Sequence, residues 1–221
     1  MNGRRAVVFD LDGTLVDSMP LVLRAYAHAL EPFAPDLTAE KILALLGGPP
    51  ERFFQSVVGS AQHAAAALER LNAYSAEHWR TIVAFDGVSA LLEHLRGASL
   101  GVGIWTGRER RSTELLLREH GIAAWVDACV CGDDLPSHKP DPAGLEAALC
   151  QLDVGRDDAW FVGDADVDVL AGAALGVRTL LITHGRETTA ALRAKAWRVV
   201  ETPAEAYVLL RAEIAGAAGG A

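Results

Sequence analysis

The chain has 221 residues, and its 29 acidic residues outnumber its 20 basic residues to give a net charge of −9. This acidic balance argues against a protein that follows a nucleic-acid backbone or an anionic membrane, because both ligands require a cationic surface. Hydrophobic residues make up 51% of the chain, which is typical of a globular protein with a sizeable core.

The cysteine pattern and the N-terminal segment indicate where such a protein works. Cys129, Cys131 and Cys150 match neither a disulfide framework nor the spacing of a zinc site. The apolar run near the N-terminus is too short for a secretion signal, and no stretch is long enough to span a bilayer. We therefore expect a cytoplasmic protein that binds neither nucleic acid nor membrane.

The first predicted element is a buried strand over residues 6–9, an apolar run that ends abruptly at Asp10. Residues 16–85 have a helical pattern instead. Gly and Pro divide this stretch into four or five predicted helices, and no strand is expected in it. The last residues, 215–221, are only Ala and Gly, and we expect them to be frayed.

From residue 86 onward, strand and helix patterns alternate, which favours a parallel sheet covered on both faces. The chain is therefore predicted to be an α/β protein, with a Rossmann-like core (residues 1–15 and 86–221) and an inserted all-helical segment (residues 16–85). The strands expected after the insertion are 100–105, 128–130, 159–162, 177–182 and 197–200.

Polar residues follow these strands where parallel α/β sheets bind ligands, outside the carboxyl ends of the strands. Asp10 and Asp12 come after the first strand, and Thr106, Gly107 and Arg108 come after the second. Lys139 lies in a later loop, and Asp164 and Asp168 follow another strand. Only three of the 20 basic residues are Lys, so a lysine at this edge indicates a need for a compact ammonium.

Each cluster taken alone has a structural explanation. Asp-Gly is a favoured turn dipeptide, Thr106 could cap a helix, Lys139 could be a solvated loop residue and one Asp after residue 163 could be an N-cap. Two neighbouring carboxylates nevertheless repel each other unless a cation or a shared proton compensates them. Four loops with such residues at one edge therefore favour a functional site.

Taken together, the motifs resemble those of the haloacid dehalogenase (HAD) superfamily, in its phosphoglycolate-phosphatase-like branch with a helical cap. The first motif, Asp-x-Asp-Gly-Thr-Leu-x-Asp, is matched at every position by residues 10–17. The Thr-Gly-Arg, Lys-Pro and Gly-Asp-x-x-x-Asp motifs follow in the expected order. The resemblance covers residues from about 5 to 185, and it implies that the helical insertion is a cap domain.

The resemblance also implies roles for the motif residues. Asp10 would be the nucleophile that forms an aspartyl-phosphate, and Asp12 the general acid and base. Thr106, Gly107 and Lys139 would hold the phosphoryl group. One Mg²⁺ would be held by Asp10, the main-chain carbonyl of Asp12, Asp164 and Asp168, the last directly or through water.

The activity implied is hydrolysis of a small phosphate ester, with phosphoglycolate as one candidate substrate. A sugar phosphomutase of the same branch shares all four motifs and stays open as an alternative. A receiver-like signalling domain is more remote, since such domains lack a helical insertion of about 70 residues. In the cap, Gly48-Pro49-Pro50-Glu51-Arg52 resembles a Gly-x-Pro-x-Arg stretch of the branch, so Arg52 is a candidate specificity residue. The alternative is that Arg52 is an exposed residue in the first turn of a helix that Pro49-Pro50 initiates.

Overall fold

The computed structural model of the protein describes residues 4–46 and 50–218. Its contacts divide the chain into two compact units. One unit runs to Asp17 and resumes at Ala84, and the other extends from Ser18 to Val83. The chain therefore leaves the first unit after its opening strand and returns to it 66 residues later.

The first unit is built on a sheet that, within the described residues, has six strands in the order β5-β4-β1-β6-β7-β8, all parallel. β1 is central and fully buried, as expected for a parallel strand covered on both faces. The strands are β1 (Ala6–Phe9), β4 (Gly101–Trp105), β5 (Ala128–Val130), β6 (Ala159–Gly163), β7 (Arg178–Ile182) and β8 (Arg198–Val200).

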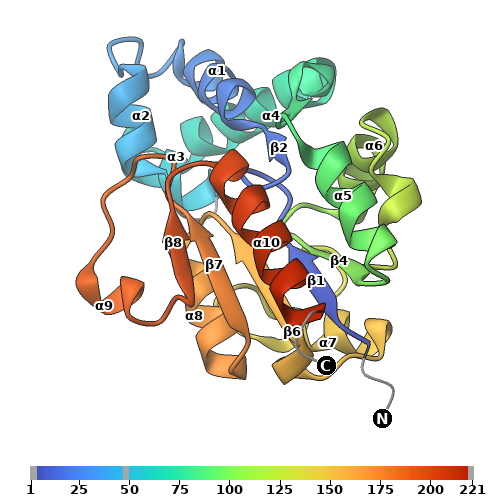
Figure 1. The fold of residues 1–221 in the computed structure, drawn as a ribbon. Helices are drawn as coiled ribbons and strands as arrows, with labels where there is room; N and C mark the ends of the chain where they lie inside the picture. Colours follow the sequence, from blue (N-terminus) through green and yellow to red (C-terminus); the bar gives the residue numbers. More distant parts are fainter. Residues whose placement is uncertain (1–3, 47–49, 219–221) are drawn as a thin grey trace. The chain divides into compact units, whose positions relative to one another are not determined.

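Helices cover both faces of this sheet (Figure 1). α7 (Ala143–Leu152) packs on β4, β5 and β1, and α8 (Asp166–Leu175) packs on β6 and β7. α5 (Val88–Gly97) and α10 (Pro203–Ala218) contact each other and lie in front of the sheet in Figure 1. The remaining helices of this unit are α6 (Arg110–Glu119) and the short α9 (Ala190–Arg193).

The second unit has its own aromatic core. The Tyr26 ring meets the Phe53 ring edge-on at 4.7 Å between centroids and stacks on the Phe54 ring at 5.4 Å. Burial of such rings holds short helices together that would be marginal alone. The helices are α1 (Met19–Leu30), α2 (Ala39–Leu45), α3 (Pro50–Val58) and α4 (Ala61–His78), followed by a 3₁₀ turn over Trp79–Thr81.

The predicted fold class is confirmed, with two local corrections. Residues 16–85 were expected to contain no strand, but the chain forms the short strands β2 (Val16–Asp17) and β3 (Val83–Ala84). The expected fraying of residues 215–221 is wrong up to residue 218, because α10 continues to Ala218. Its buried residues Tyr207, Leu210 and Ile214 anchor the helix on the unit, so the Ala-rich end follows as helix.

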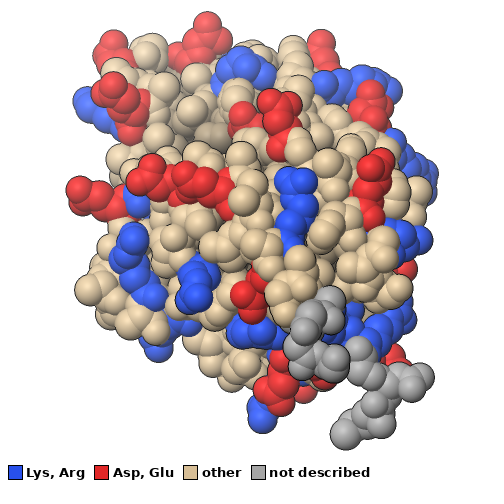
Figure 2. Space-filling view, in the orientation of Figure 1, with Lys and Arg blue, Asp and Glu red and all other residues tan. Residues whose placement is uncertain are grey.

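Both acidic and basic side chains are scattered over the face drawn in Figure 2. Among the described residues, no helix is long and apolar enough to cross a bilayer.

One contact between helix and sheet depends on a missing side chain. Gly144 lies in the first turn of α7, and a Cβ placed there would collide with the indole of Trp105 at the end of β4. Trp105 is itself buried and packs against Phe161 with ring centroids 5.4 Å apart, so it has little room to move.

Gly144→Ala should therefore destabilise the protein, although Gly to Ala in a helix is normally favourable. We expect the free energy of unfolding to fall by about 1–3 kcal/mol, because overpacking of the indole outweighs the helix propensity. Urea denaturation followed by circular dichroism measures this change. Gly97, in α5, has no heavy atom within 4 Å of an added Cβ. Gly97→Ala is the matched control and should leave stability equal or up to about 1 kcal/mol higher.

Candidate active site

The register of the sheet brings distant parts of the chain to one edge. Phe9 of β1 is paired with Ile104 of β4 on one side and with Val162 of β6 on the other. The residues that follow these three strands therefore emerge at the same level, at the carboxyl edge where parallel sheets bind ligands. Asp10, Thr106 and Asp164 are all such residues.

Three carboxylates gather at this edge. Asp10, Asp164 and Asp168 each offer an oxygen, and these oxygens all lie within 4.8 Å of one another. Asp168 is buried at 1% exposure and its side chain also accepts the main-chain N–H of Ala165 at 2.9 Å, which fixes its orientation at the start of α8. A set of clustered carboxylate oxygens fits a hard divalent cation such as Mg²⁺ or Mn²⁺.

Lys139 is the cation that this cluster already contains. Its Nζ lies 2.7 Å from Asp10 Oδ1 and 2.8 Å from Asp168 Oδ1, and its side chain is only 10% exposed. The ammonium also lies 4.8 Å from the centre of the Trp105 ring and 5.4 Å from that of Phe161. Two carboxylates and two aromatic faces thus hold a single buried positive charge in place.

The ionisation of the cluster reflects this crowding. Burial raises the pKa of Asp10 to about 7, with Lys139 opposing the shift and the charge of Asp168 adding to it. Burial likewise raises the pKa of Asp164 to about 8, and the charges of Asp10 and Asp168 add to it. Burial alone would lower the pKa of Lys139, yet Asp10 and Asp168 raise it above its usual value. One lysine is therefore too little positive charge to keep all three carboxylates ionised.

Asp12 lies apart from this cluster and has a partner of its own. Arg108 donates from Nε to Asp12 Oδ2 at 3.0 Å and from Nη2 to Asp12 Oδ1 at 2.5 Å. Both carboxylate oxygens are thus engaged in a two-pronged ion pair, the geometry in which arginine binds carboxylates best. Sequence reasoning placed Arg108 in a motif but gave its side chain no role.

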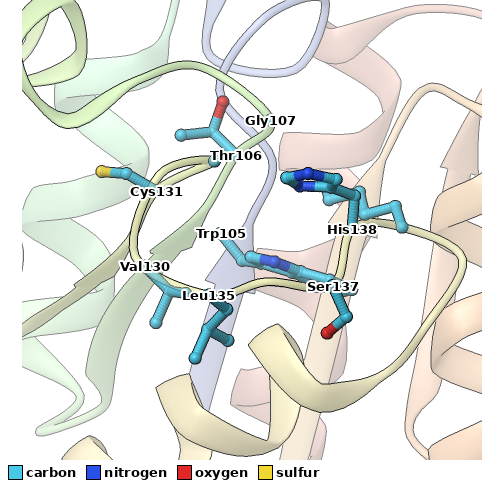
Figure 3. A pocket seen from close by; sticks show the side chains of 10 residues that line it. Trp105, Thr106, Gly107, Val130, Cys131, Leu135, Ser137 and His138 are labelled. Atoms are coloured by element: carbon cyan, nitrogen blue, oxygen red, sulfur yellow. The ribbon is translucent and has the colours of Figure 1, made fainter. Parts of the chain in front are cut away.

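A small pocket adjoins the cluster and contains the remaining predicted residues. Thr106, Gly107 and Lys139 line it, and Figure 3 shows the Thr106 side chain and the His138 ring on opposite sides with Trp105 below them. The Thr106 hydroxyl accepts the main-chain N–H of Arg108 at 3.1 Å, which fixes the turn into α6. Hydroxyl, ammonium and main-chain N–H groups side by side suit an oxyanion.

Two residues that the sequence did not single out support the loops of the site. His184 Nε2 lies 2.7 Å from the carbonyl oxygen of Gly13, and its ring stacks on Phe85. Arg186 donates to the carbonyl oxygen of Asp164 at 3.1 Å and to the Asp166 carboxylate at 2.6 Å. Neither residue lies in a recognisable motif, because a contact made by a loop after β7 leaves no local signal in the sequence.

Gly13 explains how the first and last carboxylate loops approach each other. Its φ of +74° lies in the left-handed region, and a Cβ there would collide with the carboxylate of Asp164. Glycine at this position therefore serves both the turn after Asp12 and the close approach of Asp164.

The predicted cap feature is described only in part. Gly48 and Pro49 lie outside the described residues, whereas Arg52 lies exposed in the first turn of α3, which begins at Pro50. Arg52 belongs to the second unit, and the catalytic candidates all belong to the first.

The parallel sheet and the clustered carboxylates at its carboxyl edge are features of an α/β enzyme, and the cluster suggests a divalent metal site. Residues 7–182 match the model of the haloacid dehalogenase-like hydrolase family. Pyrophosphatase PpaX of Bacillus velezensis is 32% identical over 176 residues, which cover 79% of this chain and 81% of the relative. Phosphoglycolate phosphatase 1 of Pseudomonas aeruginosa is 35% identical over 192 residues, which cover 82% of this chain and 70% of the relative.

A solved structure supports the fold. A haloacid dehalogenase-like family hydrolase from Streptococcus pneumoniae matches with a TM-score of 0.78 and 24% identity over 95% of this chain and 100% of that one. The chain thus belongs to the haloacid dehalogenase-like hydrolase family, in the branch of its phosphoglycolate phosphatase and PpaX relatives. It is a phosphatase of this type.

Divalent cations should stabilise the protein, because they relieve the repulsion among the three carboxylates. Saturating Mg²⁺ should raise the Tm by about 5 °C or more relative to EDTA, as expected for a ligand that binds only the folded state. Differential scanning calorimetry with and without the ion measures this shift.

Asp164→Asn should lose most of the Mg²⁺-dependent increase, since it removes one oxygen ligand and one charge. Asp166 is two residues away, exposed and outside the cluster. Asp166→Asn should keep the increase, and an equal loss in both variants would contradict a site at the cluster.

Proposed function

We propose that the protein is a Mg²⁺-dependent phosphatase that hydrolyses a small phosphate monoester through an aspartyl-phosphate on Asp10, and that phosphoglycolate is the first substrate to test. The observation that carries the proposal is the position of Asp10. Its carboxylate lies at the carboxyl edge of the sheet, 2.7 Å from Lys139, which also lines the pocket with Thr106 and Gly107.

Mg²⁺ would be held by the carboxylates of Asp10, Asp164 and Asp168 together with the main-chain carbonyl of Asp12. The ion supplies charge that screens the acids from the phosphate and stabilises the transferring phosphoryl group. When all four motif aspartates are ionised, they carry four negative charges, and Lys139 and Arg108 carry two positive charges. One divalent cation would neutralise the remaining two negative charges.

Asp10 would attack phosphorus, so that a bond forms between its carboxylate oxygen and phosphorus while the bond to the ester oxygen breaks. Asp12 would give a proton to the departing oxygen and later take one from the water that hydrolyses the aspartyl-phosphate. Thr106 and Gly107 would bind the phosphoryl oxygens through the hydroxyl and main-chain N–H, and Lys139 would neutralise charge beside the nucleophile.

We infer that the helical unit is a cap domain that determines substrate choice, with residues 16–85 as its extent and Arg52 as a candidate contact for the leaving group. The relatives give two candidate substrate types, since one is named a phosphoglycolate phosphatase and the other a pyrophosphatase. A phosphomutase would use the same motifs, and an assay of sugar-phosphate isomers separates it from a phosphatase.

We also infer a cytoplasmic location. The support is the state of the cysteines, all three of which are free, including Cys129 and Cys131 with sulfur atoms 3.6 Å apart. Such a pair is compatible with a reducing compartment.

Asp10→Asn should abolish turnover, because an amide cannot form the acyl phosphate. With Mg²⁺ and p-nitrophenyl phosphate, kcat should fall by at least about a thousandfold. Retention of wild-type turnover would show that Asp10 is not the nucleophile, while a far-UV circular dichroism spectrum like that of the wild type, with a cooperative thermal transition, would show that the variant is folded. Asp166→Asn is the matched control and should keep turnover.

Arg52→Ala should raise the KM for phosphoglycolate by about tenfold, the effect of losing one charged hydrogen bond, while the KM for p-nitrophenyl phosphate changes little. Steady-state kinetics on both substrates measures the difference. Lys41 is another exposed cation of the helical unit, and Lys41→Ala should alter neither KM. Equal increases for both substrates in Arg52→Ala would remove the specificity role.

A further inference from the structure

The ion pair between Arg108 and Asp12 conflicts with the work proposed for Asp12. A general acid must carry a transferable proton, but both oxygens of Asp12 accept hydrogen bonds from the guanidinium. Held by this fork, the carboxylate of Asp12 faces the guanidinium with both of its oxygens and presents neither to a departing ester oxygen. Asp12 can therefore turn toward the substrate only after the guanidinium of Arg108 has moved away from it.

The surroundings of Arg108 differ from those of the other cation at the site. Lys139 is enclosed between Asp10, Asp168 and two aromatic rings and is 10% exposed. The side chain of Arg108 is 22% exposed and that of Asp12 is 31% exposed, so solvent and solutes reach this pair. A solute with a suitable anionic group can compete with Asp12 for the guanidinium.

The backbone places the guanidinium next to the phosphoryl pocket. Arg108 directly follows Thr106 and Gly107, which line that pocket, and its main-chain N–H is bonded to the Thr106 hydroxyl. The base of the side chain is thus fixed while its end reaches across to Asp12. An anion attached close to a bound phosphoryl group would lie within range of the same fork.

We propose that Arg108 is a specificity-determining residue, which exchanges its two-pronged contact from Asp12 to a second anionic group on the substrate and thereby frees Asp12 to act as the acid. The inference rests on the proposed function and deepens it by naming the substrate class. That class is a phosphate compound with a carboxylate or a second phosphate next to the bond that breaks. A substrate with a neutral leaving group leaves Arg108 on Asp12 and reacts slowly.

Arginine suits this exchange better than lysine would. Its planar fork binds a carboxylate and a phosphate with the same two parallel hydrogen bonds, so one partner replaces the other without loss of geometry. Binding energy of the correct substrate is in this way used to assemble the catalytic site.

The test compares two esters of similar size, of which phosphoglycolate carries a second negative charge and 2-hydroxyethyl phosphate carries none, with inorganic pyrophosphate as a third probe. Wild-type kcat/KM should favour phosphoglycolate or pyrophosphate over 2-hydroxyethyl phosphate by about tenfold or more. Arg108→Met should lower kcat/KM for the favoured probe by about tenfold or more and raise it for 2-hydroxyethyl phosphate.

Two further variants keep the experiment decisive. Arg108→Lys retains the charge but not the planar fork, so its preference in kcat/KM for the favoured probe should lie between those of wild type and Arg108→Met. If Arg108→Met does not fold, Arg108→Lys provides the test. Arg111, exposed on α6, is the matched control, and Arg111→Met should keep the wild-type preference.

The outcomes separate the two proposals. Equal losses on all probes in the Arg108 variants, or a wild type that hydrolyses p-nitrophenyl phosphate without preferring a second anion, would overturn the role of Arg108 and leave the phosphatase intact. A wild type that hydrolyses no phosphate compound with Mg²⁺ would overturn the proposed function, and the role of Arg108 with it.

Discussion

Repulsion among clustered carboxylates is the constraint that the other groups of the site must compensate. Asp10, Asp164 and Asp168 have oxygens within 4.8 Å of one another, and such like charges do not remain ionised together without compensation. Lys139 supplies one positive charge from within the cluster, yet burial and the neighbouring carboxylates still raise the pKa values of Asp10 and Asp164. A divalent cation bound to these oxygens would reduce the repulsion, and its binding would then stabilise the folded form of this edge.

The fold makes this concentration of charge possible because the sheet is wound outward from its centre. β1 lies between β4 and β6 in the sheet, but both of these strands come much later in the chain. Asp10 therefore precedes by many residues the side chains that lie beside it. Each excursion returns through a helix packed on the sheet, and the loops at the carboxyl edge are held by contacts such as His184 with Gly13 and Arg186 with Asp164. Rigid strands thereby position side chains that are far apart in sequence.

Sequence patterns predicted the strands of the sheet well, because β1 and its neighbours are continuous apolar runs ended by turn residues. The groups at the edge were likewise predictable, since a residue that directly follows a buried strand can lie only there. Short-range patterns were less informative elsewhere. β2 and β3 have two residues each, too few to show a period, and α10 extends into an Ala-rich end that looks like a frayed tail. The pairing of Arg108 with Asp12 joins residues 96 apart and left no trace in either local pattern.

The return of the chain from the helical unit has a consequence for how this enzyme can diversify. The two ends of the insertion lie side by side, because β2 pairs with β3 and the N–H of Phe85 donates to the carbonyl oxygen of Leu15 at 3.0 Å. Because its ends are adjacent, the insertion connects to the first unit in the same way as a loop does. The entropic cost of closing a loop grows only slowly with its length. Helices can therefore be lengthened, shortened or replaced between these two residues while the strands keep their register. Evolution, or an engineer, can therefore exchange the helical unit, for which we propose a role in substrate choice, without rebuilding the sheet and the carboxylates at its edge.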